Sequence, residues 1–162
     1  MFGRIGPVVV TVAALFCVFA ASGCSEGRQP SATGTASPFQ PVLDDKDFMN
    51  WVLDPVTDVI WGSAGTIFTL DGEEDLAPVD DEGWARVRNA AAVVAESGNL
   101  LMLPGRSKGP DWDEFARGIV TMGQRAMAAA EAQDDEALFE VGGQLYNVCV
   151  ACHQIYMLPE SD

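Results

Sequence analysis

Two cysteines and a histidine close to the C-terminus, Cys149, Cys152 and His153, form the pattern C-x-x-C-H. Cysteines three residues apart lie on one side of a helix, where their sulfurs can form thioethers to both vinyl groups along one porphyrin edge. His153 follows Cys149 by four residues on that side, so its imidazole can reach the iron as the proximal ligand. The motif therefore predicts one covalent haem c per chain.

His153 is the only histidine of the 162 residues, which excludes a bis-histidine haem within one chain. The sixth iron ligand must then be methionine, another side chain, water or a small molecule. We expect an apolar cavity beside the motif, lined by the first and third helices described below.

Three alternatives to a haem site stay open for this motif. A zinc site needs a fourth ligand, and Cys24 is the only other cysteine left once a leader is removed. A thioredoxin-like pair sits at a helix N-terminus, whereas this motif ends a long helical pattern. A structural disulfide would close a very small loop and leave His153 without a role.

The first 24 residues predict an export signal. Arg4 precedes an apolar run of thirteen residues, Val8–Ala20, which is short of the roughly twenty residues that span a bilayer. The small residues Ala20–Gly23 lead into Cys24 and resemble the lipobox of bacterial lipoproteins, where that cysteine is lipidated. The sequence thus predicts a periplasmic protein, tethered to a membrane only through a lipid on Cys24, with ordinary cleavage as the alternative.

Residues 25–43 are rich in Ser, Thr, Pro and Gly and predict a flexible tether before one domain over 44–162. The chain has 24 acidic and nine basic residues and a formal net charge of −15. This charge excludes nucleic acid as a partner and favours a redox partner with a basic docking surface. The alternative is that the acidity only keeps an exported protein soluble.

Helical periodicity over the domain predicts an all-α fold. Four helices are expected, beginning at Asp44 or Asp45, near Asp81 or Glu82, around Asp111, and after Asp134 or Asp135. Pro55 should kink the first helix or end its first part, and the second should run to about Leu103. Residues 62–81 predict a long loop with a turn at Asp71-Gly72 and a short strand at Thr66–Leu70.

Apolar stripes mark the face that each helix should bury. They are Phe48, Met49, Val52, Val56, Val59 and Ile60; Trp84, Val87, Ala91, Val94 and Leu101; Trp112, Phe115, Ile119, Met122 and Ala126; and Leu138, Val141, Leu145, Val148 and Cys152. Gly142 and Gly143 interrupt the last helix at a cost of roughly 1 kcal/mol each. A neighbouring helix is therefore expected to approach closely there.

The terminal C-x-x-C-H, with Tyr156 three residues after His153, resembles the class II c-type cytochromes, the cytochrome c-prime family. The resemblance covers about residues 44–158 and implies an antiparallel four-helix bundle of up-down-up-down topology. The chain departs from many members of that family because it has no Lys or Arg beyond Arg125.

That topology implies which residues lie at the haem end. Met49 and Met102 would be near His153, and low-spin members of the family imply Met49 as the distal iron ligand, with Met102 second. The other methionines have different expected places: core for Met122 and Met127, and the proximal helix for Met157. If neither ligand binds, the iron is five-coordinate beneath an apolar pocket of Phe48, Val52 and Trp112.

Arg106 and Lys108 belong to the same end of the implied bundle. We expect at least one of them, Arg106 first, to pair with a haem propionate, because the surface is otherwise acidic. The alternative is that both are solvated loop cations with little energetic effect.

Two functions follow as expectations. The first is a single-haem electron carrier; the alternative is a five-coordinate haem protein that binds small gases such as NO or CO, as high-spin relatives in the resembled family do. An enzyme such as a peroxidase is not expected, because no second histidine can serve as a distal acid-base group; Glu82 and Asp111 look like helix-start acids. Pairing into a homodimer is common in that family and stays open here.

Overall fold

The computed structural model describes residues 37–157. The predicted export signal at 1–24, with Cys24, and residues 25–36 of the predicted tether lie outside the described residues, as do the last residues, 158–162. Residues 37–43, the end of the predicted tether, form neither helix nor strand.

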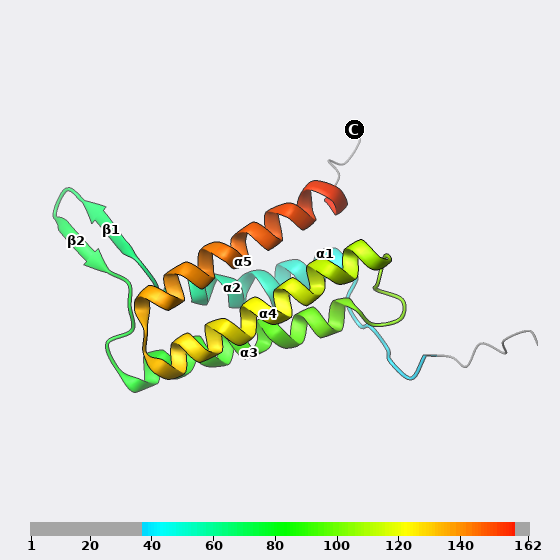
Figure 1. Ribbon diagram of the computed structural model, residues 1–162, viewed down its shortest axis with the longest axis horizontal. Helices are drawn as coiled ribbons and strands as arrows, with labels where there is room; N and C mark the ends of the chain where they lie inside the picture. The colour runs from blue at the N-terminus through cyan, green and yellow to red at the C-terminus, as the bar shows by residue number, and fades with distance from the viewer. Residues whose placement is uncertain (1–36, 158–162) are drawn as a thin grey trace, which may run out of the picture. The chain divides into compact units, whose positions relative to one another are not determined.

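The described residues are mostly helical, which confirms the all-α class (Figure 1). The elements in chain order are α1 (Asp45–Phe48), the π-helical segment η1 (Met49–Leu53), α2 (Asp54–Trp61), β1 (Thr66–Thr69), β2 (Gly72–Asp75), α3 (Asp81–Leu101), α4 (Pro110–Ala132) and α5 (Asp135–Tyr156). The second long helix, α3, thus ends two residues before the predicted Leu103.

Aspartates begin three of the helices. The side chains of Asp44, Asp80 and Asp134 each accept a hydrogen bond from the backbone N–H three residues later, at 2.7 to 2.9 Å. Each thereby pairs an N–H group of the first turn that has no acceptor within the helix. Helix α4 begins differently, with Gly109 at a φ of 114° followed by Pro110, whose fixed φ suits the first helical position.

The interruption predicted at Pro55 takes the form of the π turn η1. The N–H of Asp54 donates to the carbonyl of Met49, five residues back. A proline ring clashes with the carbonyl four residues before it, here that of Trp51, and a wider turn relieves this crowding. The helix therefore continues past Pro55 instead of ending there.

The extra residue in the π turn also changes which side chains face inward. Leu53 and Thr57 are buried, whereas Val59, predicted to be buried, is 37% exposed. The predicted stripe was wrong at Val59 because it assumed uniform α-helical spacing.

The predicted long loop at 62–81 contains a β-hairpin. Thr66 pairs with Asp75 and Thr69 with Gly72 in an antiparallel ladder, and the N–H of Leu76 donates to Gly65 O at 2.9 Å. The first strand was predicted within Thr66–Leu70. The second strand was missed because Gly72–Asp75 holds glycine and acidic residues, which are depleted in strands.

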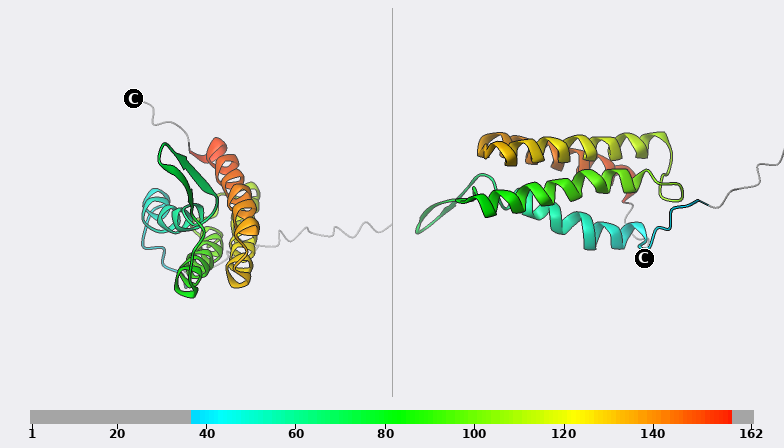
Figure 2. Two further views of the ribbon diagram at one scale, coloured as in Figure 1. Left: turned by 90° about the vertical axis from the view of Figure 1, so that its left-hand side faces the viewer. Right: turned by 90° about the horizontal axis from the view of Figure 1, so that it is seen from below.

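Helices α3, α4 and α5 pack side by side in chain order, and α2 packs against both α3 and α5 (Figures 1 and 2). The predicted stripe of α3 is buried throughout, including Val87, Ala91 and Val94. Leu138 and Leu145 of α5 are fully buried. The core therefore runs between the helices along their length.

The two central helices approach most closely at glycines. A Cβ added at Gly123 of α4 would lie 2.5 Å from the Ala95 backbone nitrogen of α3 and 2.9 Å from the Ala91 carbonyl oxygen. Both are backbone atoms and cannot rotate away. Gly123 thus sets the distance between α3 and α4.

We expect Gly123→Ala to lower the free energy of unfolding by about 2 kcal/mol, because overpacking outweighs the gain in helix propensity. The matched control is Gly143→Ala in α5, where an added Cβ meets nothing within 4 Å. This control should raise stability by up to about 1 kcal/mol. Urea unfolding of both variants checks the pair, and equal effects would contradict the close contact.

Candidate functional site

A cavity of about 300 Å³ lies beside the C-x-x-C-H motif on the last turns of α5. Cys149, Cys152 and His153 all border it. Its walls come from the helical stretch 45–61 (α1, η1 and α2) and from α3, α4 and α5, and most of the lining side chains are apolar. The sequence predicted an apolar cavity lined by the first and third helices, which are the stretch 45–61 and α4, and this expectation is confirmed.

The wall opposite His153 differs from the predicted one. Trp112 lines the cavity as expected, together with Leu53 and Phe115, but Phe48 and Val52 do not. Phe48 packs under the Arg106 guanidinium, with 4.4 Å between its ring centroid and Cζ. Val52 lines a shallow groove against α3. Leu53, four residues after Met49, lines the cavity in place of Val52.

The two candidate distal ligands are separated by the structure. Met49 lines the cavity that Cys149 and His153 border. Met102, the C-terminal cap of α3, does not, and its sulfur is 3.9 Å from Nη1 of Arg117. Of these two methionines, the structure thus brings only Met49 together with His153.

Both thiols of the motif are free and disfavour ionisation. Burial, followed by the neighbouring Cys152 and then Asp54, raises the pKa of Cys149 to about 11. Burial also raises the pKa of Cys152, although Lys108 lowers it in part. Redox-active cysteines work as thiolates at lowered pKa. The raised pKa of both thiols beside an apolar cavity fits instead a pair held against a hydrophobic group.

In the haem-free mature polypeptide, we expect iodoacetamide to label Cys149 about a hundredfold more slowly at pH 8 than in the urea-unfolded chain. The thiolate is the reacting form, and the raised pKa keeps the thiol protonated, so the folded-state rate should rise as the pH approaches 11. Mass spectrometry of peptides locates the label. Equal folded and unfolded rates at pH 8 would contradict the burial.

Two aromatic residues that the sequence pattern did not single out stand at one side of the cavity. Trp61 and Tyr146 both line it, with ring centroids 6.1 Å apart in an edge-to-face arrangement. The Trp61 indole donates a hydrogen bond to the Gly142 carbonyl at 3.0 Å, and a Cβ on Gly142 would lie 3.3 Å from the indole. The expected close approach is therefore right for Gly142 and wrong for Gly143.

Tyr156, three residues after His153, packs on Trp112, which lines the cavity. Its ring lies edge-to-face on Trp112, with centroids 5.0 Å apart. The Trp112 indole donates to the Leu101 carbonyl at 2.8 Å. These contacts join the ends of α3, α4 and α5 around the motif.

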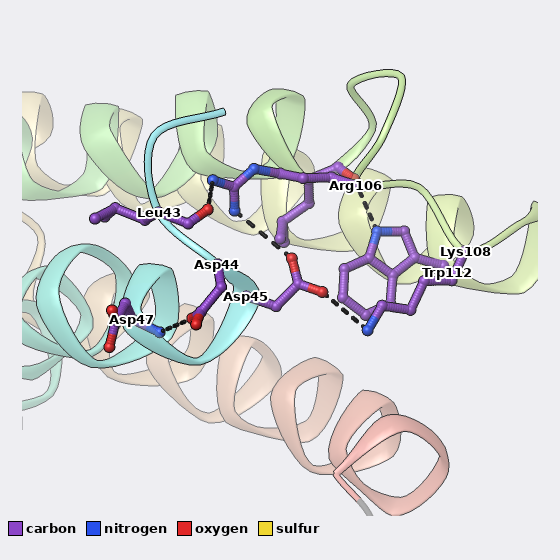
Figure 3. Close-up of polar contacts among 8 residues, drawn as sticks. Leu43, Asp44, Asp45, Asp47, Arg106, Lys108 and Trp112 are labelled. Atoms are coloured by element: carbon purple, nitrogen blue, oxygen red, sulfur yellow. Dashed lines mark hydrogen bonds and ion pairs between the residues drawn. The ribbon is translucent and has the colours of Figure 1, made fainter. Parts of the chain in front are cut away.

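The two cations predicted near a propionate have partners within the chain (Figure 3). Arg106 is 7% exposed, and its Nη2 donates to the Leu43 carbonyl at 2.8 Å. Lys108 Nζ is 2.9 Å from the Asp45 carboxylate and lies 4.7 Å from the centroid of the Trp112 ring. Neither is a freely solvated loop cation. Arg106 Nη1 is buried without a hydrogen-bond partner in the described chain.

Comparisons with protein-family models, curated proteins and solved structures found no match to this chain. Between residues 37 and 157, none of the helices combines the length and the apolar character required to cross a membrane.

Proposed function

We propose that this chain is a single-haem c-type cytochrome that carries electrons. The observation that carries the proposal is that Cys149, Cys152 and His153 border the same apolar cavity as Met49, which comes from a different helix. The apolar cavity supports attachment of a hydrophobic group, and the raised pKa of both thiols supports this over a redox-active pair.

The resemblance to class II c-type cytochromes supplies the proposed architecture. The helical stretch 45–61, α3, α4 and α5 would form an antiparallel four-helix bundle, with the hairpin inserted between the first two helices. The packing of α3 on α4, α4 on α5, and α2 on both α3 and α5 supports this arrangement.

Each site residue has a proposed role. Cys149 and Cys152 would hold the haem through thioethers, and His153 would bind the iron from the proximal side. Met49 would bind from the distal side, so that both oxidation states stay six-coordinate and electron transfer needs little rearrangement. The haem iron supplies the one-electron couple.

Arg106 is proposed to donate to a haem propionate through Nη1. The support is that this nitrogen is buried and lacks a hydrogen-bond partner among residues 37–157, since the nearest carboxylate oxygen, on Asp45, is 3.7 Å away. A charge-assisted hydrogen bond to a carboxylate would satisfy it. An Arg106→Ala variant with an unchanged reduction potential would remove this role.

The proposed setting is the periplasm, with a lipid on Cys24 as the only membrane attachment. The proposed partner is a redox protein with a basic docking surface, because the chain carries a formal net charge of −15. No role in catalysis or nucleic-acid binding is proposed.

The test is to produce the protein in a host that attaches haem c and to measure its mass and optical spectrum. We expect the mass of one haem added to the peptide that contains Cys149 and Cys152, together with a methionine-to-iron charge-transfer band. A colourless protein with no added mass would end the proposal. A five-coordinate high-spin spectrum would instead support the alternative, a protein that binds NO or CO.

A further inference from the structure

Met49 lies one turn from the start of the helical stretch 45–61, in which α1 (Asp45–Phe48), the π turn η1 and α2 follow without a break. The first turn of a helix frays easily, because its backbone N–H groups have no partners within the helix. The position of Met49 therefore depends in part on what attaches this first turn to the core.

The Asp45 carboxylate provides one attachment, and Figure 3 shows it between the two cations of the α3–α4 loop. One oxygen lies 2.9 Å from Lys108 Nζ, and the other lies 3.7 Å from Arg106 Nη1. The Asp45 side chain is 33% exposed and that of Arg106 only 7%, so solvent screens this ion pair less than a surface pair.

Arg106 also holds the residues on either side of Asp45. It donates to the Leu43 carbonyl just before the helix, at 2.8 Å. Its guanidinium covers the ring of Phe48, which directly precedes Met49. Arg106 thus contacts Asp45 and Phe48 in the first turn and Leu43 just before it.

Asp45 supplies the negative charge that this buried guanidinium faces. In the holoprotein the proposed propionate would also pair with Arg106, so loss of the Asp45 carboxylate would let the guanidinium turn toward the propionate alone. That movement would release Leu43 and Phe48 and would leave Lys108 without its ion-pair partner. Asp45 and Met49 lie four residues apart, one helical turn, so movement of the turn displaces the Met49 sulfur.

We propose that Asp45, held by Arg106 and Lys108, is a positioning residue that keeps Met49 at bonding distance from the haem iron. The inference rests on the proposed haem and on Met49 as its distal ligand. It adds that the methionine bond depends on an ion pair between α1 and the loop that joins α3 to α4.

The experiment compares the ferric holoprotein with Asp45→Asn, and with Asp47→Asn as a matched control in the same turn. We expect Asp45→Asn to lower the ratio of methionine-bound to methionine-free haem by about tenfold. The charge-transfer band should weaken, and imidazole, which must replace the methionine, should bind correspondingly faster. Asp47→Asn, with the same loss of charge, should leave both readouts unchanged.

Two further variants keep the test decisive if Asp45→Asn folds poorly. Asp45→Glu keeps the carboxylate and should retain most of the charge-transfer band. Lys108→Met, at a half-exposed position, removes one partner of Asp45 and should weaken the band, as Asp45→Asn does. Circular dichroism shows whether the helices persist. If the band is undiminished in Asp45→Asn and Lys108→Met, the inference about Asp45 is wrong, but the proposed methionine ligation stands. If the band is absent from the unaltered holoprotein, both the proposed ligation and the inference are wrong.

Discussion

The double variant Cys149→Ser, Cys152→Ser should carry no covalent haem. Both sulfurs border the cavity and come from successive turns of one face of α5, so no other cysteine between residues 37 and 157 can replace them. We expect the purified variant to have the mass of the polypeptide alone and to lose its haem absorption after acid–acetone extraction. Each single variant should retain one thioether and remain coloured.

The matched control is Ala151→Ser, which introduces the same hydroxyl between the two cysteines without removing a sulfur. It should gain the mass of one haem, as the unaltered chain does. A double variant that still carries the added mass would show that haem is joined to another residue, and a control that loses it would indicate a general effect on this turn of α5.

Met49→Ala should abolish the methionine-to-iron charge-transfer band and convert the ferric haem to a high-spin form. Met49 is the methionine that shares the cavity with His153. Loss of methionine ligation should also lower the reduction potential, by a sizeable part of the roughly 0.8 V range that axial ligands control. Spectroscopy and a redox titration of the holoprotein measure the two effects.

Met102→Ala is the matched control for this variant. Its side chain lies near Arg117 and outside the cavity, so the band and the potential should be unchanged. If the band persists in Met49→Ala and is lost in Met102→Ala, then the assignment of the distal ligand is wrong. If it persists in both, neither methionine is the ligand.

Helix positions were largely predictable because their signals are local. Asp44 and Asp134 begin helices as predicted, and the helix predicted to start near Asp81 or Glu82 begins at Asp81 with Asp80 as its cap. All three caps accept a hydrogen bond from the backbone three residues ahead. The stripe of α3 has the period of a regular helix and faces the core as predicted. Pattern and local chemistry agree for these elements.

The site was predictable in part. The motif indicated Cys149, Cys152 and His153, whereas Leu53 and Trp61 were missed as cavity walls. Met49, Leu53, Thr57 and Trp61 recur every four residues, and all four line the cavity. That spacing drifts around a regular α-helix, and only a widened turn keeps it on one face. Pro55, which lies inside this repeat, was the available signal.

The contacts of Asp45 could not be predicted. They join residues more than sixty positions apart in the chain, Asp45 with Arg106 and Lys108. The segment 44–47 contains three aspartates. Local periodicity does not say which of them will contact a cation in a distant loop. Only the packed arrangement of the helices decides this.

The β-hairpin has a consequence for the behaviour of the protein at high concentration. A two-stranded sheet leaves both outer strands with unpaired backbone groups, which invite edge-to-edge association. In β2, three of four residues are carboxylates: Glu73, Glu74 and Asp75. Two copies that joined through the β2 edge would bring these charges face to face, so the acidic strand discourages association through that edge.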